Sequence, residues 1–221
     1  MKLLLSGIVK FIMGILLVGV LLFLPAGTIN YGGGLLFTAL LFIPIFILGV
    51  VLFVKSPDLL RKRLDHKEKE STQKGVVALS ALVFSGGFVV SGLDFRFSWS
   101  GVPLFVTIVA SVMFLLSYVL YAEVMRENAY LSRTVKVEEG QQVVSTGLYG
   151  VVRHPMYMAT VLMFMMIPLI LGSLYALIIF GVYPFIIALR IKDEERLLEA
   201  ELKGYKEYKE KVKYRMIPFI W

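Results

Sequence analysis

Long runs of apolar residues alternate along this chain with short stretches rich in charge. Four of the runs contain 18 to 24 residues, at 3–24, 33–54, 76–93 and 102–125. At 1.5 Å per residue, helices of this size are roughly 27 to 36 Å long, about the thickness of a bilayer's hydrocarbon core. These runs therefore predict membrane-spanning helices.

Two further apolar runs, 155–171 and 174–190, contain 17 residues each and are separated by Gly172-Ser173. A helix of that size is about 26 Å long, and each run includes a proline, Pro168 or Pro184, that can bend it. The pair predicts a tight helical hairpin that only just crosses the bilayer. Whether it spans completely is open from the sequence.

Together the runs predict an all-α, polytopic membrane helical bundle of about six transmembrane helices, ending in a cytoplasmic C-terminal helix. The expected division is an N-terminal set of helices, 1–125, with a loop at 55–75, and a C-terminal region, 126–221, containing the hairpin 155–190 and the tail 191–221. The first run could also belong to a cleaved signal peptide. No small-residue cleavage site stands clearly after it, which favours a retained helix.

Composition narrows the chemistry. With 58% hydrophobic residues and a mean hydropathy of +0.79, the chain is too apolar for a water-soluble globule. It has no cysteine, which excludes disulfides, thiolate metal sites and a cysteine nucleophile. Of its two histidines, His66 lies in a basic loop and is expected to be solvated, which leaves His154. We therefore expect no metal catalyst.

Basic residues collect on one predicted side of the membrane. Of the 23 Lys and Arg residues, 22 fall on one side if both termini are cytoplasmic, and only Arg96 falls on the other. This asymmetry fits the positive-inside rule, so the net charge of +7 indicates topology and lipid contacts rather than nucleic-acid binding. Asp94 and Glu123, near the ends of runs, are expected to be interfacial rather than catalytic.

A polar patch precedes the hairpin, within Gly147-Leu-Tyr-Gly-Val-Val-Arg-His-Pro-Met-Tyr157. Proline suits the first turn of a helix, so Pro155 places His154 at the helix entrance, near free backbone N–H groups and the positive end of the dipole. Such a position can hold a carboxylate or another anion. Tyr157 follows one turn later.

A second patch follows the hairpin. Arg190 and Glu194 are four residues apart and share a helix face, whereas Glu195 points about 100° round the helix. Because the two arms of a hairpin are antiparallel, both patches return to the same membrane surface. Ordinary alternatives are open: Arg153 and Tyr157 as interfacial anchors, and Arg190 with Glu194 as a surface ion pair.

At these residues the sequence resembles the C-terminal signature of the isoprenylcysteine carboxyl methyltransferase superfamily, part of which phospholipid N-methyltransferases share. Four separated elements occur in the family's order: Gly147–Tyr157, Arg190 with Glu194-Glu195, Gly204-Tyr205-x-x-Tyr208, and Tyr214-Arg215-Met-Ile-Pro218. The likeness is specific over residues 140–221. Upstream, residues 56–63 and 128–133 are similar to prokaryotic members.

The resemblance implies an integral methyltransferase of a prokaryotic cell membrane that uses S-adenosylmethionine in a cytoplasm-facing pocket. Asn128, Ser132 and Arg133 are expected to border its entrance. By match of motif, the candidate catalytic residues are Arg190, at the reacting end of the substrate, and Glu194. The candidate cofactor-binding residues are Tyr149, Arg153, His154, Pro155, Tyr157, Glu194 and Glu195.

The acceptor is open from the sequence. A carboxyl group on an isoprenylcysteine-like or other lipid-like molecule is the first expectation, and a phospholipid amine or a small thiol are alternatives. Two other classes are also considered: a sterol-reductase-like enzyme with a nicotinamide cofactor, and a non-enzymatic scaffold or small transporter. The polar clusters lie at one surface rather than at mid-bilayer, which argues against a transport path.

Overall fold

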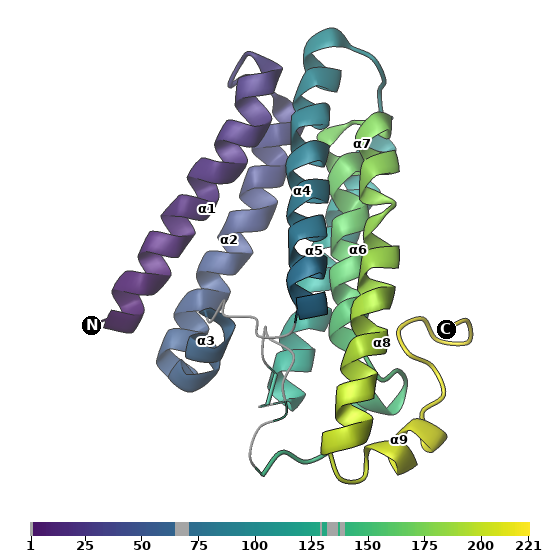
Figure 1. Ribbon diagram of the computed structural model, residues 1–221. Helices are drawn as coiled ribbons and strands as arrows, with labels where there is room; N and C mark the ends of the chain where they lie inside the picture. The colour runs from purple at the N-terminus through teal and green to yellow at the C-terminus, as the bar shows by residue number, and fades with distance from the viewer. Residues whose placement is uncertain (1, 65–70, 129, 132–136, 138–139) are drawn as a thin grey trace.

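The computed structural model describes the chain except for residues 1, 65–70, 129, 132–136 and 138–139 (Figure 1). Over the described residues the secondary structure is helical and contains no strand. The first helices are α1 (Lys2–Ala26), α2 (Gly32–Lys55), α3 (Pro57–Leu64), α4 (Ser71–Phe97) and α5 (Leu104–Glu127). After the 3₁₀ turn η1 (Gly147–Gly150) come α6 (Pro155–Leu171), α7 (Leu174–Phe180), α8 (Tyr183–Glu201) and α9 (Tyr205–Lys211).

The molecule is an integral membrane protein. Five segments are long and apolar enough to cross a bilayer: Leu3–Ala26, Gly32–Lys55, Gly75–Phe97, Leu104–Glu127 and Leu174–Glu201. Their outward side chains are large and apolar, and many are more than half exposed, as on α1 and α5. Water would penalise so large an apolar surface, whereas lipid tails solvate it. The polytopic helical bundle expected from the sequence is confirmed.

The C-terminal hairpin differs from its expected form in the second arm. The first arm, α6, is 17 residues long as predicted and stops at Gly172, whose φ of 78° favours glycine. The second arm is broken at Gly181-Val182, so Pro184 lies in the first turn of α8, where proline is tolerated. α8 then continues past residue 190 to Glu201, because its polar end is rich in Leu, Glu, Ala and Arg, which are good helix formers.

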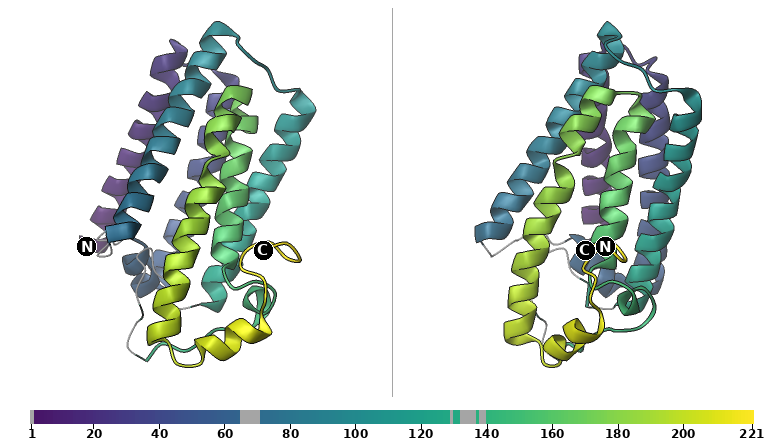
Figure 2. Two further views of the ribbon diagram at one scale, coloured as in Figure 1. Left: turned by 45° about the vertical axis from the view of Figure 1, so that its right-hand side comes forward. Right: turned by 90° about the vertical axis from the view of Figure 1, so that its right-hand side faces the viewer.

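The helices form one bundle in which consecutive spans run in opposite directions (Figure 1). α5 packs along α6, α1 against α4, and α4 against α7 and α8. Both termini and the segment that leads into α6 lie at the same end of the bundle, which is the lower end in Figure 1 and in both views of Figure 2. We call it the basic end, because the loop after α2, the segment before α6 and the C-terminal tail carry most of the Lys and Arg residues.

A buried carboxylate fastens the opposite end. Asp94, expected at the interface, is 1% exposed. It accepts hydrogen bonds from the backbone N–H of Ser100 at 2.7 Å and from the hydroxyls of Ser100 and Ser173 at 2.6 and 2.5 Å. The Ser173 hydroxyl in turn accepts from the N–H of Ala176. Asp94 therefore ties the loop after α4 to the hairpin turn. Glu123, by contrast, pairs at the surface with Arg126.

Glycine allows α1 and α4 to approach closely. A Cβ atom on Gly92 would lie 2.5 Å from the carbonyl oxygen of Leu22 and 3.0 Å from the backbone nitrogen of Ala26. Helices in membranes associate largely through such close packing, because lipid tails remove much of the hydrophobic drive between helices. Six residues earlier, a Cβ atom on Gly86 would meet nothing within 4 Å.

We expect Gly92→Ala to destabilise the bundle by about 1 to 3 kcal/mol, because the added methyl group forces two backbones apart. Gly86→Ala is the matched control on the same helix and should be neutral, or stabilising by up to about 1 kcal/mol from helix propensity. Thermal unfolding in detergent measures both. Equal unfolding temperatures for the two variants would contradict the close α1–α4 contact.

Candidate active site

The entrance to α6 is held by the C-terminal tail. His154 is the residue before the helix, and Pro155 occupies the first turn, as predicted. The backbone N–H of Arg153 donates to the carbonyl of Tyr214 at 2.9 Å, and that of His154 donates to Arg215 at 2.8 Å. Two short segments about sixty residues apart are therefore paired side by side. This pairing fixes the backbone position from which the His154 side chain extends.

A buried ionic cluster lies behind this entrance. Glu195, on α8, is 3% exposed. Its Oε1 accepts from Arg153 Nε at 2.7 Å and lies 3.3 Å from His154 Nε2, while its Oε2 accepts from Arg215 Nε at 2.9 Å. Arg153 also donates to the carbonyls of Val212 and Lys213, at 2.6 and 2.9 Å. The cluster joins the start of α6, α8 and the tail.

This cluster serves to position the site. Burying an ion costs several kcal/mol unless opposite charge and hydrogen bonds compensate it. Both oxygens of Glu195 are engaged by cations of the chain, and the guanidinium of Arg153 is satisfied by a carboxylate and two carbonyls. These groups are therefore committed to one another and hold the three segments in register.

The neighbouring glutamate faces the other way. Glu194 has a side chain that is 24% exposed, and its Oε2 accepts from the Tyr157 hydroxyl at 2.5 Å. The same hydroxyl accepts from Arg190 Nε at 2.7 Å, and the guanidinium carbon lies 5.8 Å from the centre of the Tyr157 ring. His154 Nδ1 is 3.9 Å from Glu194 Oε1. The Tyr157 hydroxyl thus bridges a cation and a carboxylate.

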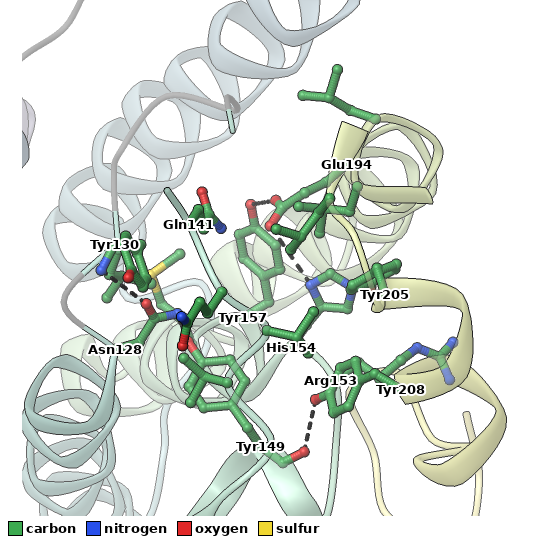
Figure 3. Close-up of a pocket in the computed structure, with 18 of the residues that line it drawn as sticks. Asn128, Tyr130, Gln141, Tyr149, Arg153, His154, Tyr157, Glu194, Tyr205 and Tyr208 are labelled. Atoms are coloured by element: carbon green, nitrogen blue, oxygen red, sulfur yellow. Dashed lines mark hydrogen bonds and ion pairs between the residues drawn. The ribbon is translucent and has the colours of Figure 1, made fainter. Parts of the chain in front are cut away.

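A pocket opens in front of Glu194 (Figure 3). It takes in about 850 Å³ of empty space, its open mouth included. Its walls come from the segments on either side of η1, from α6 and α8, and from α9. Its polar lining residues are Asn128, Tyr130, Gln141, Gln142, Tyr149, Arg153, His154, Tyr157, Arg190, Glu194, Tyr205 and Tyr208.

Two tyrosines of α9 complete one wall. The Tyr208 hydroxyl donates to the carbonyl of Tyr149 at 2.7 Å, and the Tyr149 hydroxyl accepts from Asn128 Nδ2 at 2.9 Å. The Tyr205 hydroxyl is buried and, over the described part of the chain, has no hydrogen-bond partner. Burial raises the pKa of Tyr205 and of Tyr208 above the usual value of tyrosine, so both hydroxyls stay protonated at neutral pH.

The structure brings together most of the residues that the sequence singled out. Glu195 and Pro155 stand apart, since neither lines the pocket in the described structure: Glu195 is buried behind it and Pro155 shapes the helix start. Asn128 does lie at the pocket, whereas Ser132, Arg133 and His66 fall outside the described residues. Of the catalytic and cofactor-binding residues predicted from the sequence, those that line the pocket are Tyr149, Arg153, His154, Tyr157, Arg190 and Glu194.

Tyr205 and Tyr208 belong to the Gly204-Tyr205-x-x-Tyr208 element, for which the sequence predicts no role. Their spacing of three residues puts both on one helix face, and this spacing is the signal in the sequence that places them together.

Over the described residues, no group of three or more His, Asp or Glu side chains is arranged to hold a metal ion.

Comparison with known proteins finds similarity in the part of the chain that forms most of this site. Residues 105–203 match the family model of the phospholipid methyltransferases, and this range includes η1, the hairpin and both glutamates of α8. A stretch of 91 residues is 31% identical to the Delta(14)-sterol reductase TM7SF2 of Mus musculus, which is 40% of this chain and 22% of that protein. The chain is thus similar over residues 105–203 to a family of membrane methyltransferases, and over a shorter stretch to part of a reductase.

The two glutamates should respond differently to the loss of charge. Glu195→Gln leaves the buried Arg153 and the partly exposed Arg215 without their counter-ion, so we expect a loss of about 3 to 5 kcal/mol of stability. Glu194→Gln, at a partly exposed position, should cost less than about 1 kcal/mol. Thermal unfolding of both variants in detergent, without added ligand, tests this. A Glu195→Gln protein as stable as Glu194→Gln would show that the cluster does not hold the site.

Proposed function

We propose that this protein is a membrane methyltransferase that uses S-adenosylmethionine and acts on a lipid-like acceptor. The observation that carries the proposal is the carboxylate of Glu194, which faces a pocket at the membrane surface beside the start of α6. A cationic cofactor with an anionic tail suits this combination of a carboxylate and a positive helix end. The match of residues 105–203 to the phospholipid methyltransferases supports the same class.

The residues present fit such a cofactor. Glu194 would pair with its ammonium group or its ribose hydroxyls, and the start of α6 by His154 would receive its carboxylate. The Tyr205 hydroxyl is a buried donor with no partner in the described structure, which a bound ligand would supply. Tyr149 and Tyr157 add ring surface to the walls. Glu195 and Arg153 would act indirectly, by holding the start of α6 in place.

The cofactor, when bound, supplies a methyl group on a sulfonium, which an acceptor takes by in-line displacement. The chain's own residues then have to align the acceptor and keep water out. Arg190 is held by the Tyr157 hydroxyl at the pocket wall, where its charge would orient and neutralise an acceptor carboxylate. A carboxylate needs no general base, whereas a protonated amine would have to lose a proton, and Glu194 is the nearest candidate to take it.

For the acceptor we propose first the carboxyl group of an isoprenylcysteine-like lipid, since Arg190 complements a carboxylate. The second candidate is a phospholipid amine, which the name of the matching family favours. We place the pocket at the cytoplasmic surface, because the basic end carries nearly all the Lys and Arg residues. The likeness of residues 56–63 and 128–133 to prokaryotic members of the family is our ground for a prokaryotic cell membrane.

A reductase with a nicotinamide cofactor is the second candidate function, and the similarity to a sterol reductase favours it. The charges of the pocket argue against it. A phosphorylated dinucleotide needs several cationic groups, but the guanidinium of Arg153 is committed to Glu195 and two carbonyls. The exposed face of Glu194 would repel the phosphates. We therefore rank the reductase below the methyltransferase.

Equilibrium binding of labelled S-adenosylmethionine and of NADPH to the purified protein separates the two functions. We expect S-adenosylmethionine to bind. Glu194→Gln should weaken this binding about tenfold or more, because a charge-assisted hydrogen bond is lost. Glu199→Gln is the matched control: Glu199 lies on the same helix, pairs with Lys209, and does not line the pocket in the described structure. Binding of NADPH but not of S-adenosylmethionine would overturn the proposal.

The same labelled cofactor can identify the acceptor. The protein in membranes is incubated with methyl-labelled S-adenosylmethionine and a total lipid extract, and the labelled product is treated with base. A methyl ester releases a volatile label, whereas a methylated amine retains it. Release supports the carboxyl acceptor, whereas retention excludes it and leaves the phospholipid amine or a thiol.

Tyr205→Phe should weaken the binding of S-adenosylmethionine by about 1 to 2 kcal/mol, roughly five- to thirty-fold in affinity, because one buried donor to the ligand is lost. Its folding stability should change little, since the hydroxyl has no partner in the described protein. Tyr208→Phe is the contrasting variant. It removes a hydrogen bond to Tyr149, so it should lower the unfolding temperature more than the affinity. The reverse pattern would refute the role of Tyr205.

A further inference from the structure

The C-terminal tail ends in a closed turn that returns to the helices. After α9 the chain reverses and rises beside the bundle (Figure 1, Figure 2). The N–H groups of Met216 and Ile217 both donate to the carbonyl of Trp221, at 2.9 and 3.0 Å, and the N–H of Trp221 donates back to Ile217 at 3.1 Å. These bonds close residues 216–221 into a defined turn, which we call the terminal turn.

The inner side of the terminal turn belongs to the core of the bundle. Met216 is buried in the same apolar cluster as Tyr157 and Ile187, and Trp221 packs against that cluster. The guanidinium carbon of Arg215 lies 5.3 Å from the centre of the Trp221 ring. The turn is therefore held against the membrane-spanning helices at the height of the site.

The outer side is apolar and uncovered. Phe219 is 85% exposed, Ile220 78% and Ile217 40%. Phe219 and Ile220 are as exposed as outward-facing side chains on the spanning helices, such as Phe185 at 74%. Three adjacent apolar side chains on a fixed turn would be unfavourable in water, whereas lipid tails would solvate them.

The charges that precede the turn match a membrane surface. Residues 203–215 contain six Lys and Arg residues against two glutamates. Lys206, Lys211 and Lys213 are exposed there. A basic segment that leads into exposed aromatic and branched side chains is the pattern of an interfacial anchor on an anionic lipid surface.

We propose that the terminal turn inserts into the bilayer leaflet at the basic end, with Phe219 and Ile220 among the lipid tails and the lysines at the headgroups. The same tail pairs with Arg153 and His154 and supplies Arg215 to Glu195. Insertion therefore braces the entrance of α6 from the membrane side. The effect of this bracing on ligand binding rests on the function proposed above, but the insertion of the terminal turn does not.

Tryptophan fluorescence tests the insertion directly, because the chain has two tryptophans, Trp99 and Trp221. In Trp99→Phe protein reconstituted into vesicles with anionic lipid, the emission of Trp221 should be quenched by lipids brominated on their tails and not by iodide in the water. Adding Phe219→Asp with Ile220→Asp should reverse both results, whereas Phe219→Leu with Ile220→Leu is the matched apolar control and should change neither.

Quenching by iodide but not by brominated lipid in the Trp99→Phe protein would overturn the insertion. So would quenching by brominated lipid that persists in the double aspartate variant, because it would not arise from the two apolar side chains.

A second measurement tests the bracing in the same vesicles. The double aspartate variant should bind S-adenosylmethionine about tenfold more weakly than the double leucine variant. Equal affinities would overturn the bracing. If neither protein binds the cofactor while Trp221 is still quenched by brominated lipid, the proposed function fails and the insertion stands.

Discussion

A buried carboxylate needs compensating charge, and that requirement organises the basic end of this molecule. Glu195 carries its negative charge into a site that is 3% exposed, and arginines from two other segments neutralise it. A salt bridge of this kind adds little net stability, because desolvation offsets much of the attraction. Its effect is on position: α8, the start of α6 and the tail cannot shift relative to one another without uncovering a charge.

The opposite end of the bundle sets the height at which these groups meet. Asp94 and Ser173 fix the hairpin turn, and α6 descends 17 residues from it to His154. The second arm descends a similar distance to Arg190. The polar groups of both arms therefore reach the membrane surface at one level. The continuation of α8 to Glu201 places α9 beside the pocket, where Tyr205 and Tyr208 form one wall.

The two adjacent glutamates of α8 show how one helix can serve structure and chemistry together. Successive residues point about 100° apart on a helix. Glu195 therefore faces the arginines while Glu194 faces the pocket, with its carboxylate beside Tyr157 and His154. The buried member keeps the helix in register, which leaves the exposed member available to a ligand.

The sequence by itself determined the membrane bundle, the hairpin and the identity of most of the polar residues that line the pocket. Apolar length and helix period are local properties, so the spans, Gly172 and the entrance at His154-Pro155 could be read directly. The polar groups of the two arms could be placed at one surface because a hairpin is antiparallel.

Only the tertiary structure decided which of the two glutamates is buried, because that depends on Arg153 and Arg215 arriving from segments distant in the chain. It likewise decided that Asp94 is buried by Ser100 and Ser173, and that the Tyr205 hydroxyl at the pocket has no hydrogen-bond partner among the described residues. Hydrophobic periodicity says how far a helix runs and which side it buries. The partner of a buried polar group is set by contacts between segments far apart in sequence, which no local pattern contains.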